Sequence, residues 1–378
     1  MKFKLFVYFL FLFLVGISLA QGWMHNYGGS GNDYGMSVTP TIDGGYVIAG
    51  FTNGYGARQS ALFLLKVDSN GKLIWRRVID NASSDYGNYI HCTSDSGFIV
   101  TGRSYNKLWV LKLDCDGDTI WTYTDETESE GLFVQQTIDN GYIVVGWSYR
   151  DYSIMDYGRK VYILKFNSSG DTVWTRTYGN GKGYYAQQTS DGGYIVTGEH
   201  KKYSYGSYGD ILLMKTDSKG WEEWTKIFGG KYNDIGRYVK QTPDSGYILA
   251  GYTYLRSKYY DGWLIKTNSL GDTIWTRTYG GNGDDLIYSL EQLDDGGYML
   301  IGTTNSSGAR NGDLWIIRTD SLGDILFTKK FGGLGKDVGT CIRRTSDGNF
   351  IISGYTRSLG IGYDVYLIKI DEYGKILR

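Results

Sequence analysis

The chain has 378 residues and a formal net charge of −1, and it contains 55 Gly, 35 Tyr and 11 Trp but only 2 Pro. A charge this close to zero excludes a global basic field for nucleic acid. The many glycines and aromatic residues favour tight turns and half-buried strands, and no long segment has a helical period, so little helix is expected.

Residues 1–20 are predicted to be a secretory signal peptide. Lys2 and Lys4 precede an unbroken apolar run over residues 5–15, and Ser18 and Ala20 place small residues where signal peptidase cleaves. A membrane anchor is the alternative, but the apolar run is short for a bilayer span, and no other stretch could cross a membrane. We therefore expect export to the extracellular space or the periplasm, with a mature chain that starts at Gln21.

One phrase recurs seven times through the rest of the chain. It reads DGGYVIAG over residues 43–50, and its other copies begin at Asp95, Asp139, Asp191, Asp244, Asp295 and Asp347. The steps between copies are 52, 44, 52, 53, 51 and 52 residues. A fixed period of this length indicates a repeat architecture.

Each unit of this repeat is predicted to be a four-stranded antiparallel meander. In the copy at Asp295, the expected strands are residues 287–293, 298–302, 314–319 and 324–331. One such sheet exposes both faces, and stacking the units side by side buries them. We therefore expect an all-β seven-bladed β-propeller that forms a single domain over residues 21–378.

The third and fourth strands carry two further repeated residues, which we interpret as scaffold. The fourth strand has an aromatic residue that we expect to pack between blades: Trp75, Trp121, Trp174, Trp224, Trp275 and Phe327. The third strand has a basic residue that we expect to be a paired charge at a blade edge: Lys66, Lys112, Lys165, Lys215, Lys266, Arg318 and Lys369.

The two ends of the chain together supply one strand. Arg378 stands where the last copy should have its Trp, whereas Trp23 lies four residues before Tyr27, as Trp275 does before Tyr279. The N-terminal strand is therefore predicted to complete blade 7 and close the ring. Since a closed ring leaves no free interface at a seam, we expect a monomer.

Two phrases resemble known propeller families. The pattern from Lys66 to Trp75, Lys-x-Asp-Ser-x-Gly-x-x-x-Trp, resembles the tryptophan-docking motif of quinoprotein-type propellers, with one residue fewer between Asp and Gly. The Asp-Gly-Gly-Tyr phrase, with Gly-Gly-x-Gly-x-Asp at residues 28–33, resembles the repeats of secreted bacterial β-propeller proteins. The resemblance covers residues 22–378, implies a propeller and brings no catalytic residues. The cofactor-binding set that a quinoprotein enzyme implies has no match here, so no cofactor is expected.

Residues 28–33 also match the start of a calcium-binding nonapeptide. That site needs tandem copies, whereas copies here are about 50 residues apart. We expect the repeated Asp to accept backbone N–H groups where the chain enters each first strand, with a weak cation site near the channel mouth as the alternative. These residues are Asp33, Asp85, Asp234, Asp285 and Asp337.

Histidine and cysteine give no metal-site pattern. The chain has three histidines, in different blades, and an odd number of cysteines, of which Cys92 and Cys115 fall in one repeat and could pair. We interpret the cysteines as incidental and expect no metal site. The three histidines are His25, His91 and His200, and the third cysteine is Cys341.

The long loops between the second and third strands are the candidate ligand-binding region. Residues 147–160, 199–209 and 252–260 are rich in Tyr, Ser, Gly and Arg, a composition typical of adaptable recognition surfaces. The alternative is that the whole chain is rich in Tyr, so its loops are too. The candidate ligand-binding residues are Trp147, Tyr149, Arg150, Tyr152, Tyr205, Tyr208, Tyr252, Tyr254, Arg256 and Tyr259.

The sequence favours a secreted, non-catalytic module that binds a glycan or a protein at the cell surface. The alternative is an enzyme at the central channel, either a quinoprotein-like oxidoreductase or a hydrolase. No Gly-x-Ser-x-Gly elbow or P-loop is present, so no catalytic residue is assigned. Carboxylates meeting across the channel would favour the hydrolase.

Overall fold

A computed structural model describes residues 23–150, 158–202, 208–255, 259–306, 308–309 and 311–376. These residues form strands, turns and bends. The described part of the chain contains no helix that could cross a membrane. The predicted all-β fold class is confirmed.

Four sheets contain four antiparallel strands each. The first holds β2 (Asp33–Pro40), β3 (Tyr46–Thr52), β4 (Ala61–Val67) and β5 (Leu73–Ile79). The second holds β16 (Asp234–Gln241), β17 (Tyr247–Tyr254), β18 (Tyr260–Thr267) and β19 (Thr273–Tyr279). The third holds β20 (Asp285–Gln292), β21 (Tyr298–Thr304), β22 (Asp313–Thr319) and β23 (Ile325–Phe331). The fourth runs in the order β1 (Met24–Tyr27), β26 (Asp364–Ile370), β25 (Phe350–Thr356) and β24 (Asp337–Arg344).

The remaining strands form one ten-stranded sheet in which two long strands join three units. β9 and β12 are 18 and 17 residues long, and each is the fourth strand of one unit and the first strand of the next. The strands are β6 (Tyr86–Cys92), β7 (Phe98–Ser104), β8 (Lys107–Leu113), β9 (Thr119–Gln136), β10 (Tyr142–Ser148), β11 (Lys160–Phe166), β12 (Thr172–Gln188), β13 (Tyr194–Lys201), β14 (Gly209–Thr216) and β15 (Glu222–Phe228).

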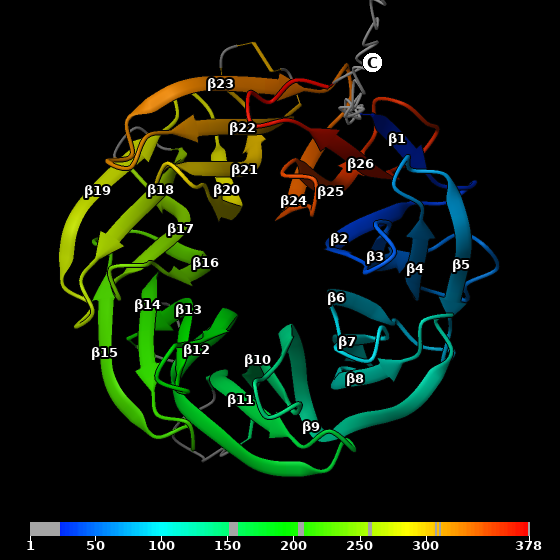
Figure 1. Ribbon diagram of the computed structural model, residues 1–378, viewed down its shortest axis with the longest axis horizontal. Helices are drawn as coiled ribbons and strands as arrows, with labels where there is room; N and C mark the ends of the chain where they lie inside the picture. Colours follow the sequence, from blue (N-terminus) through cyan, green and yellow to red (C-terminus); the bar gives the residue numbers. More distant parts are fainter. Residues whose placement is uncertain are drawn as a thin grey trace, which may run out of the picture.

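The sheets stand around a central space, with the first strand of each unit innermost and the fourth outermost (Figure 1). The second and third strands are covered on both faces by neighbouring sheets, so they read as nearly continuous apolar runs; in β3, Val47, Ile48 and Ala49 are all buried. The fourth strands are more exposed, as the alternation along β19 shows. The hydrophobic core therefore lies between the sheets, and the innermost strands frame the centre.

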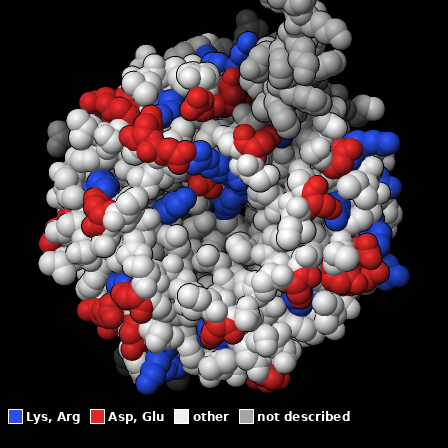
Figure 2. Space-filling model, in the orientation of Figure 1, with Lys and Arg blue, Asp and Glu red and all other residues white. Residues whose placement is uncertain are grey.

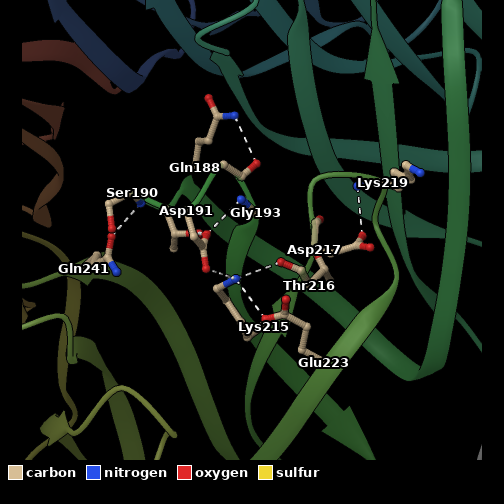
Figure 3. A network of polar contacts seen from close by, with 12 residues as sticks. Gln188, Ser190, Asp191, Gly193, Lys215, Thr216, Asp217, Lys219, Glu223 and Gln241 are labelled. Atoms are coloured by element: carbon tan, nitrogen blue, oxygen red, sulfur yellow. Dashed lines mark hydrogen bonds and ion pairs between the residues drawn. The ribbon is translucent and has the colours of Figure 1, made fainter.

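The repeated basic residue of the third strand is an ion-pair partner, as predicted. Lys215, with 3% of its side chain exposed, lies 2.8 Å from Asp191 of the preceding tight turn and 3.0 Å from Glu223 (Figure 3). Its ammonium also donates to the Thr216 carbonyl at 3.0 Å. The corresponding pairs are Lys66–Asp43, Lys112–Asp95, Lys165–Asp139, Lys266–Asp244, Arg318–Asp295 and Lys369–Asp347.

The repeated Trp of the fourth strand packs on the next unit. Trp174 lies against Gly220, which has a φ of +79°, and 6.1 Å from the ring of Tyr194. Gly is required at this turn because a Cβ would be strained by the positive φ and would meet the indole. β1 repeats the arrangement, since Trp23 lies against Gly71 of the first unit and 5.9 Å from Tyr46.

The repeated Asp at the start of the first strand accepts a backbone N–H group four residues earlier, as predicted. Gly281 N donates to Asp285 at 2.8 Å, and Gly29 N donates to Asp33 at the same distance. Asp85, Asp234 and Asp337 do the same. The three cysteines are free thiols.

Candidate binding site in the central channel

Each first strand carries a β-bulge at an equivalent position. In β16, Gly236 pairs with Gly251 and Tyr238 pairs with Ala250, which leaves Arg237 as the extra residue. A bulge bends the strand and redirects a side chain. The extra residues, which we call the bulge ring, are Met36, Asn88, Leu132, Tyr184, Arg237, Tyr288 and Thr340.

The last glycine of the repeated phrase is what accommodates this bulge. Gly302 lies opposite the bulge of β20, and a Cβ at that position would collide with the carbonyl oxygen of Leu286. The corresponding glycines of the other units meet the same steric limit. The phrase that marks the repeat therefore also encodes the bulge.

Every member of the bulge ring is half-buried and lines a central cavity of about 210 Å³. Pockets that enclose a whole small-molecule ligand begin at about 300 Å³. The cavity is therefore the right size for an end group of a ligand, with the rest of that ligand outside.

Three tyrosines that line this cavity, Tyr89, Tyr185 and Tyr238, pack together with Phe133. The ring of Phe133 lies 4.7 Å from Tyr89 and 4.2 Å from Tyr185, and Tyr185 lies 4.1 Å from Tyr238. The Arg343 guanidinium lies over Tyr89 and Tyr238, at 5.6 and 5.7 Å. We call these four rings the aromatic floor, because each residue follows its bulge toward the tight turn that ends the first strand.

Arg237 lies on the loop side of the aromatic floor, since it precedes Tyr238 in a strand that runs toward the tight turn. Its guanidinium lies 4.6 Å from the ring centre of Tyr184 and 5.2 Å from that of Tyr288. Burial raises the pKa of both tyrosines well above the usual range, so both hydroxyls stay neutral. Arg237 forms no ion pair among the described residues.

The carboxylates nearest to this part of the channel already have partners. Glu130 accepts the indole N–H of Trp147 at 3.0 Å and the amide of Asn88 at 3.0 Å. Glu199 lies 3.3 Å from the ammonium of Lys201. Neither of them forms an ion pair with Arg237.

A basic layer lies on the other side of the aromatic floor. Glu291 is shared between Lys240, at 3.0 Å, and Arg343, at 3.7 Å. Burial, followed by the nearby Arg343 charge, lowers the pKa of His91 to about 4, so this imidazole is neutral at pH 7. Figure 2 shows the corresponding face, with basic side chains on the wall of the central hollow over β16 and β24.

A continuous row of tyrosines leads from the loops to the cavity. Successive ring centres are 6.0, 5.4, 5.0, 5.3 and 6.3 Å apart. All are half-buried except the first, which is 62% exposed. This tyrosine row consists, in order, of Tyr208, Tyr232, Tyr254, Tyr260, Tyr252 and Tyr288.

The structure brings some of the predicted site residues together. Tyr208, Tyr252 and Tyr254 belong to the tyrosine row, and Tyr259, 41% exposed, precedes Tyr260. Tyr152, Tyr205 and Arg256 lie outside the described residues.

The predicted residues of β10 and its loop form a separate group with structural contacts. Trp147 is 1% exposed, and the guanidinium of Arg159 lies over its ring, 4.2 Å from the ring centre. Trp147 therefore has no exposed surface for a ligand. Tyr149 is half-buried with its ring edge on Trp147. Arg150 pairs with the buried carboxylate of Asp125.

The sequence reasoning missed the channel residues. Tyr184, Arg237 and Tyr288 are about 50 residues apart and meet only because their strands converge on the centre. A signal was available: the residue that follows the glycine, or its equivalent, in each first strand varies between units, with six residue types at seven positions.

One other hollow is a weaker candidate. A hollow of about 530 Å³ beside β5, β8 and β9 is lined by residues without a charged side chain, among them Tyr105 and Trp109. Among the described residues, no group of three or more His, Cys, Asp or Glu side chains could hold a metal ion.

No protein-family model matches the sequence, and no curated protein matches it either. Solved structures match the fold. Streptogramin B lyase aligns with a TM-score of 0.56 at 10% identity, over 93% of this chain and 98% of its own. The WD40 domain of Pan2 from Neurospora crassa aligns with a TM-score of 0.55 at 10% identity, over 95% and 98%. BBS1N in complex with ARL6DN aligns with a TM-score of 0.53 at 11% identity, over 93% and 96%. Because WD40 repeats form propellers, the fold of this chain is a β-propeller.

Proposed function

We propose that the chain is a seven-bladed propeller whose ring is closed by β1. Seven copies of the phrase, the pairing of Met24 with Ile368 in β26, and the contact of Trp23 with Gly71 support this arrangement. The domain then covers residues 21–378 and, with no open seam, is a monomer. Sedimentation of the purified protein tests the monomer, and a dimer would contradict it.

The function we propose is non-catalytic binding of a saccharide on the loop side of the propeller. The observation that carries it is the tyrosine row, which extends from exposed Tyr208 to Tyr288 in the cavity wall. A tyrosine offers an apolar ring face and a hydroxyl together, which suits a sugar with its apolar C–H face and its hydroxyl groups. A row of such rings with a small cavity at its end fits a chain-like ligand that enters by one end.

A protein ligand is the second candidate. BBS1N, which shares the fold, was solved bound to ARL6DN. Tyr and Arg are also the residues that most often dominate protein interfaces.

An enzyme is less well supported. The fold is shared with streptogramin B lyase, yet likeness of fold does not carry a reaction to this chain. The cavity lining contains no Asp, Glu or His, whereas glycoside hydrolysis uses two carboxylates.

The proposal is tested by a glycan array followed by calorimetric titration of the saccharide that binds best. Tyr208→Ala and Tyr254→Ala should each weaken binding about tenfold, because each removes one ring of the row. Tyr373→Ala is the matched control, since Tyr373 is 67% exposed but lies in the turn after β26, on the opposite rim. Binding that survives both changes, or no binding to any saccharide, would contradict the proposal.

We also propose that the chain is exported after cleavage behind Ala20. Expression in a secreting host followed by N-terminal sequencing of the exported protein should give Gln21 as the first residue. Retention of residues 1–20 on a membrane-bound protein would contradict it.

A further inference from the structure

We propose that the cavity receives an anionic substituent of the saccharide, a carboxylate or a sulfate, and that Arg237 is its ion-pair partner. This inference rests on the proposed function and names the chemical class of its ligand.

The first step is the state of Arg237. Tyr184 and Tyr288 lie against its guanidinium, and the side chain lines a cavity only partly open to water. Partial loss of hydration disfavours a charge that has no ion-pair partner. Arg237 forms no ion pair among the described residues, so its charge is available to a ligand that enters the cavity.

The second step is geometry. The guanidinium of Arg237 lies over the rings of Tyr184 and Tyr288, and it is a planar group whose N–H donors form a rigid fork. That fork matches the two oxygens of a carboxylate or a sulfate group. Arg237 is the bulged residue of β16, and the bulge directs its side chain into the cavity.

The third step is the field of the channel. Arg237 and Arg343 line the cavity, and Glu291 forms ion pairs with Arg343 and with Lys240. Neutral His91 adds no charge. The charged side chains that line the cavity, Arg237 and Arg343, are both cationic, and a concave site lined by one sign of charge concentrates ions of the other sign.

The fourth step is size. A cavity of about 210 Å³ holds one terminal group, and the tyrosine row begins at its wall with Tyr288. An acidic sugar at the end of a chain places its charge at Arg237 while the following sugars lie along the row.

The test is an array of acidic oligosaccharides, each beside a neutral counterpart: uronic acids beside their carboxyl-reduced forms, and sulfated sugars beside their desulfated forms. The wild-type protein should prefer the acidic member, and the preference should shrink as salt is raised. The pair with the larger preference identifies carboxylate or sulfate as the bound group.

Arg237→Gln should weaken binding of the acidic member about ten- to a hundredfold, to the level of its neutral counterpart. Arg237→Lys should retain part of the preference, because it keeps the charge and loses the fork. The matched control is Arg277→Gln, at an outer-strand arginine paired with Asp324 at 3.0 Å, which should bind as wild type does. Melting curves and circular dichroism establish that each variant is folded. If Arg237→Gln does not fold, the test is made with Arg237→Lys.

An unchanged preference for the acidic member in folded Arg237→Gln or Arg237→Lys would overturn this inference. The proposed function would still stand if Tyr254→Ala weakened both members of the pair. A wild-type protein that binds neutral saccharides equally well would also overturn this inference alone, and one that binds none would overturn both proposals.

Discussion

The repeated lysine of the third strand holds the tight turn of its own unit. Lys215 is almost fully buried, and its three bonds connect the Asp191 turn, Glu223 of β15 and the Thr216 carbonyl. The side chains of its two carboxylate partners, Asp191 and Glu223, are 57% and 44% exposed, so only the cation is buried.

Lys215→Met should therefore lower the free energy of unfolding by roughly 1.5–3 kcal/mol, because a charged donor of several hydrogen bonds is lost. Lys219→Met is the control, since Lys219 is exposed in the next turn and should change stability by less than about 0.5 kcal/mol. Urea denaturation of both variants measures the difference. Equal effects would mean that the ion pair does not stabilise the turn.

A second residue-scale feature is the approach of two carboxylates between neighbouring sheets. Asp285 accepts hydrogen bonds from Gly281 N and from the Ser306 hydroxyl, the latter at 2.6 Å. Asp261 Oδ1 is buried, and no hydrogen-bond donor among the described residues contacts it. Burial, followed by the Asp285 charge, raises the pKa of Asp261 to about 6. A raised carboxyl pKa disfavours the ionised form in the folded state, so stability falls as the pH rises from about 4 to about 6.

Asp261→Asn should therefore stabilise the fold at about pH 8, by up to about 1 kcal/mol after allowance for solvent screening of a half-buried group. At about pH 4 the gain should largely vanish, because the wild-type carboxyl is then protonated in the folded state. Melting temperatures of both proteins at the two pH values measure this. A gain independent of pH would contradict the assignment.

Residue roles that repeat in every unit could be predicted from the sequence, and those that occur once could not. Lys215 and Asp285 were interpretable because other copies show the same residue type in the same place: a basic residue in all seven and Asp in five. Arg237 is one of a kind, and its meaning depends on Tyr184 and Tyr288, which neighbouring units supply. Trp147 was misplaced as a candidate because a loop-side Trp in a Tyr-rich segment reads as exposed until the packing of Arg159 over it is known.

At the scale of elements, β1 is the strand that connects the two ends of the chain. It has four residues, all paired with β26, and Trp23 reaches across to Gly71 of the first unit. Its pairing was predicted from the spacing of Trp23 and Tyr27. The bulges, by contrast, were not predicted, because the extra residue in each first strand shows only when the pairing register is known.

Deleting residues 21–29 should lower the free energy of unfolding by several kcal/mol, since β26 loses one of its two partner strands and Gly71 loses its contact with the Trp23 indole. Trp23→Ala should account for roughly 2 kcal/mol of this, because its side chain is only partly buried. Thermal melts of the two variants separate pairing from packing. An unchanged melting temperature in the deletion would show that β1 does not stabilise the fold.

At the scale of the whole molecule, the pairing of β1 with β26 brings together residues more than 340 positions apart, such as Met24 and Ile368. Placing β1 directly after β26 in the sequence should reduce the loop-closure entropy that folding must overcome. A circular permutant with residues 30–377 followed directly by 23–29 makes β1 continuous with the turn after β26. We expect it to melt at or above the temperature of the mature chain, and a markedly lower melting temperature would contradict the closed ring.

The residues of the bulge ring line the cavity of this propeller without taking part in the strand pairing that holds its sheets together. The extra residues stand outside the hydrogen-bonded ladder, and a glycine on the adjacent strand already accommodates each of them. A combinatorial library randomised at the bulge ring alone would therefore change the side chains that line the cavity. The Asp–Lys pairs and the tryptophans that stabilise the fold would stay in place. Selection from such a library could yield receptors for unrelated small ions and end groups on one unchanged scaffold.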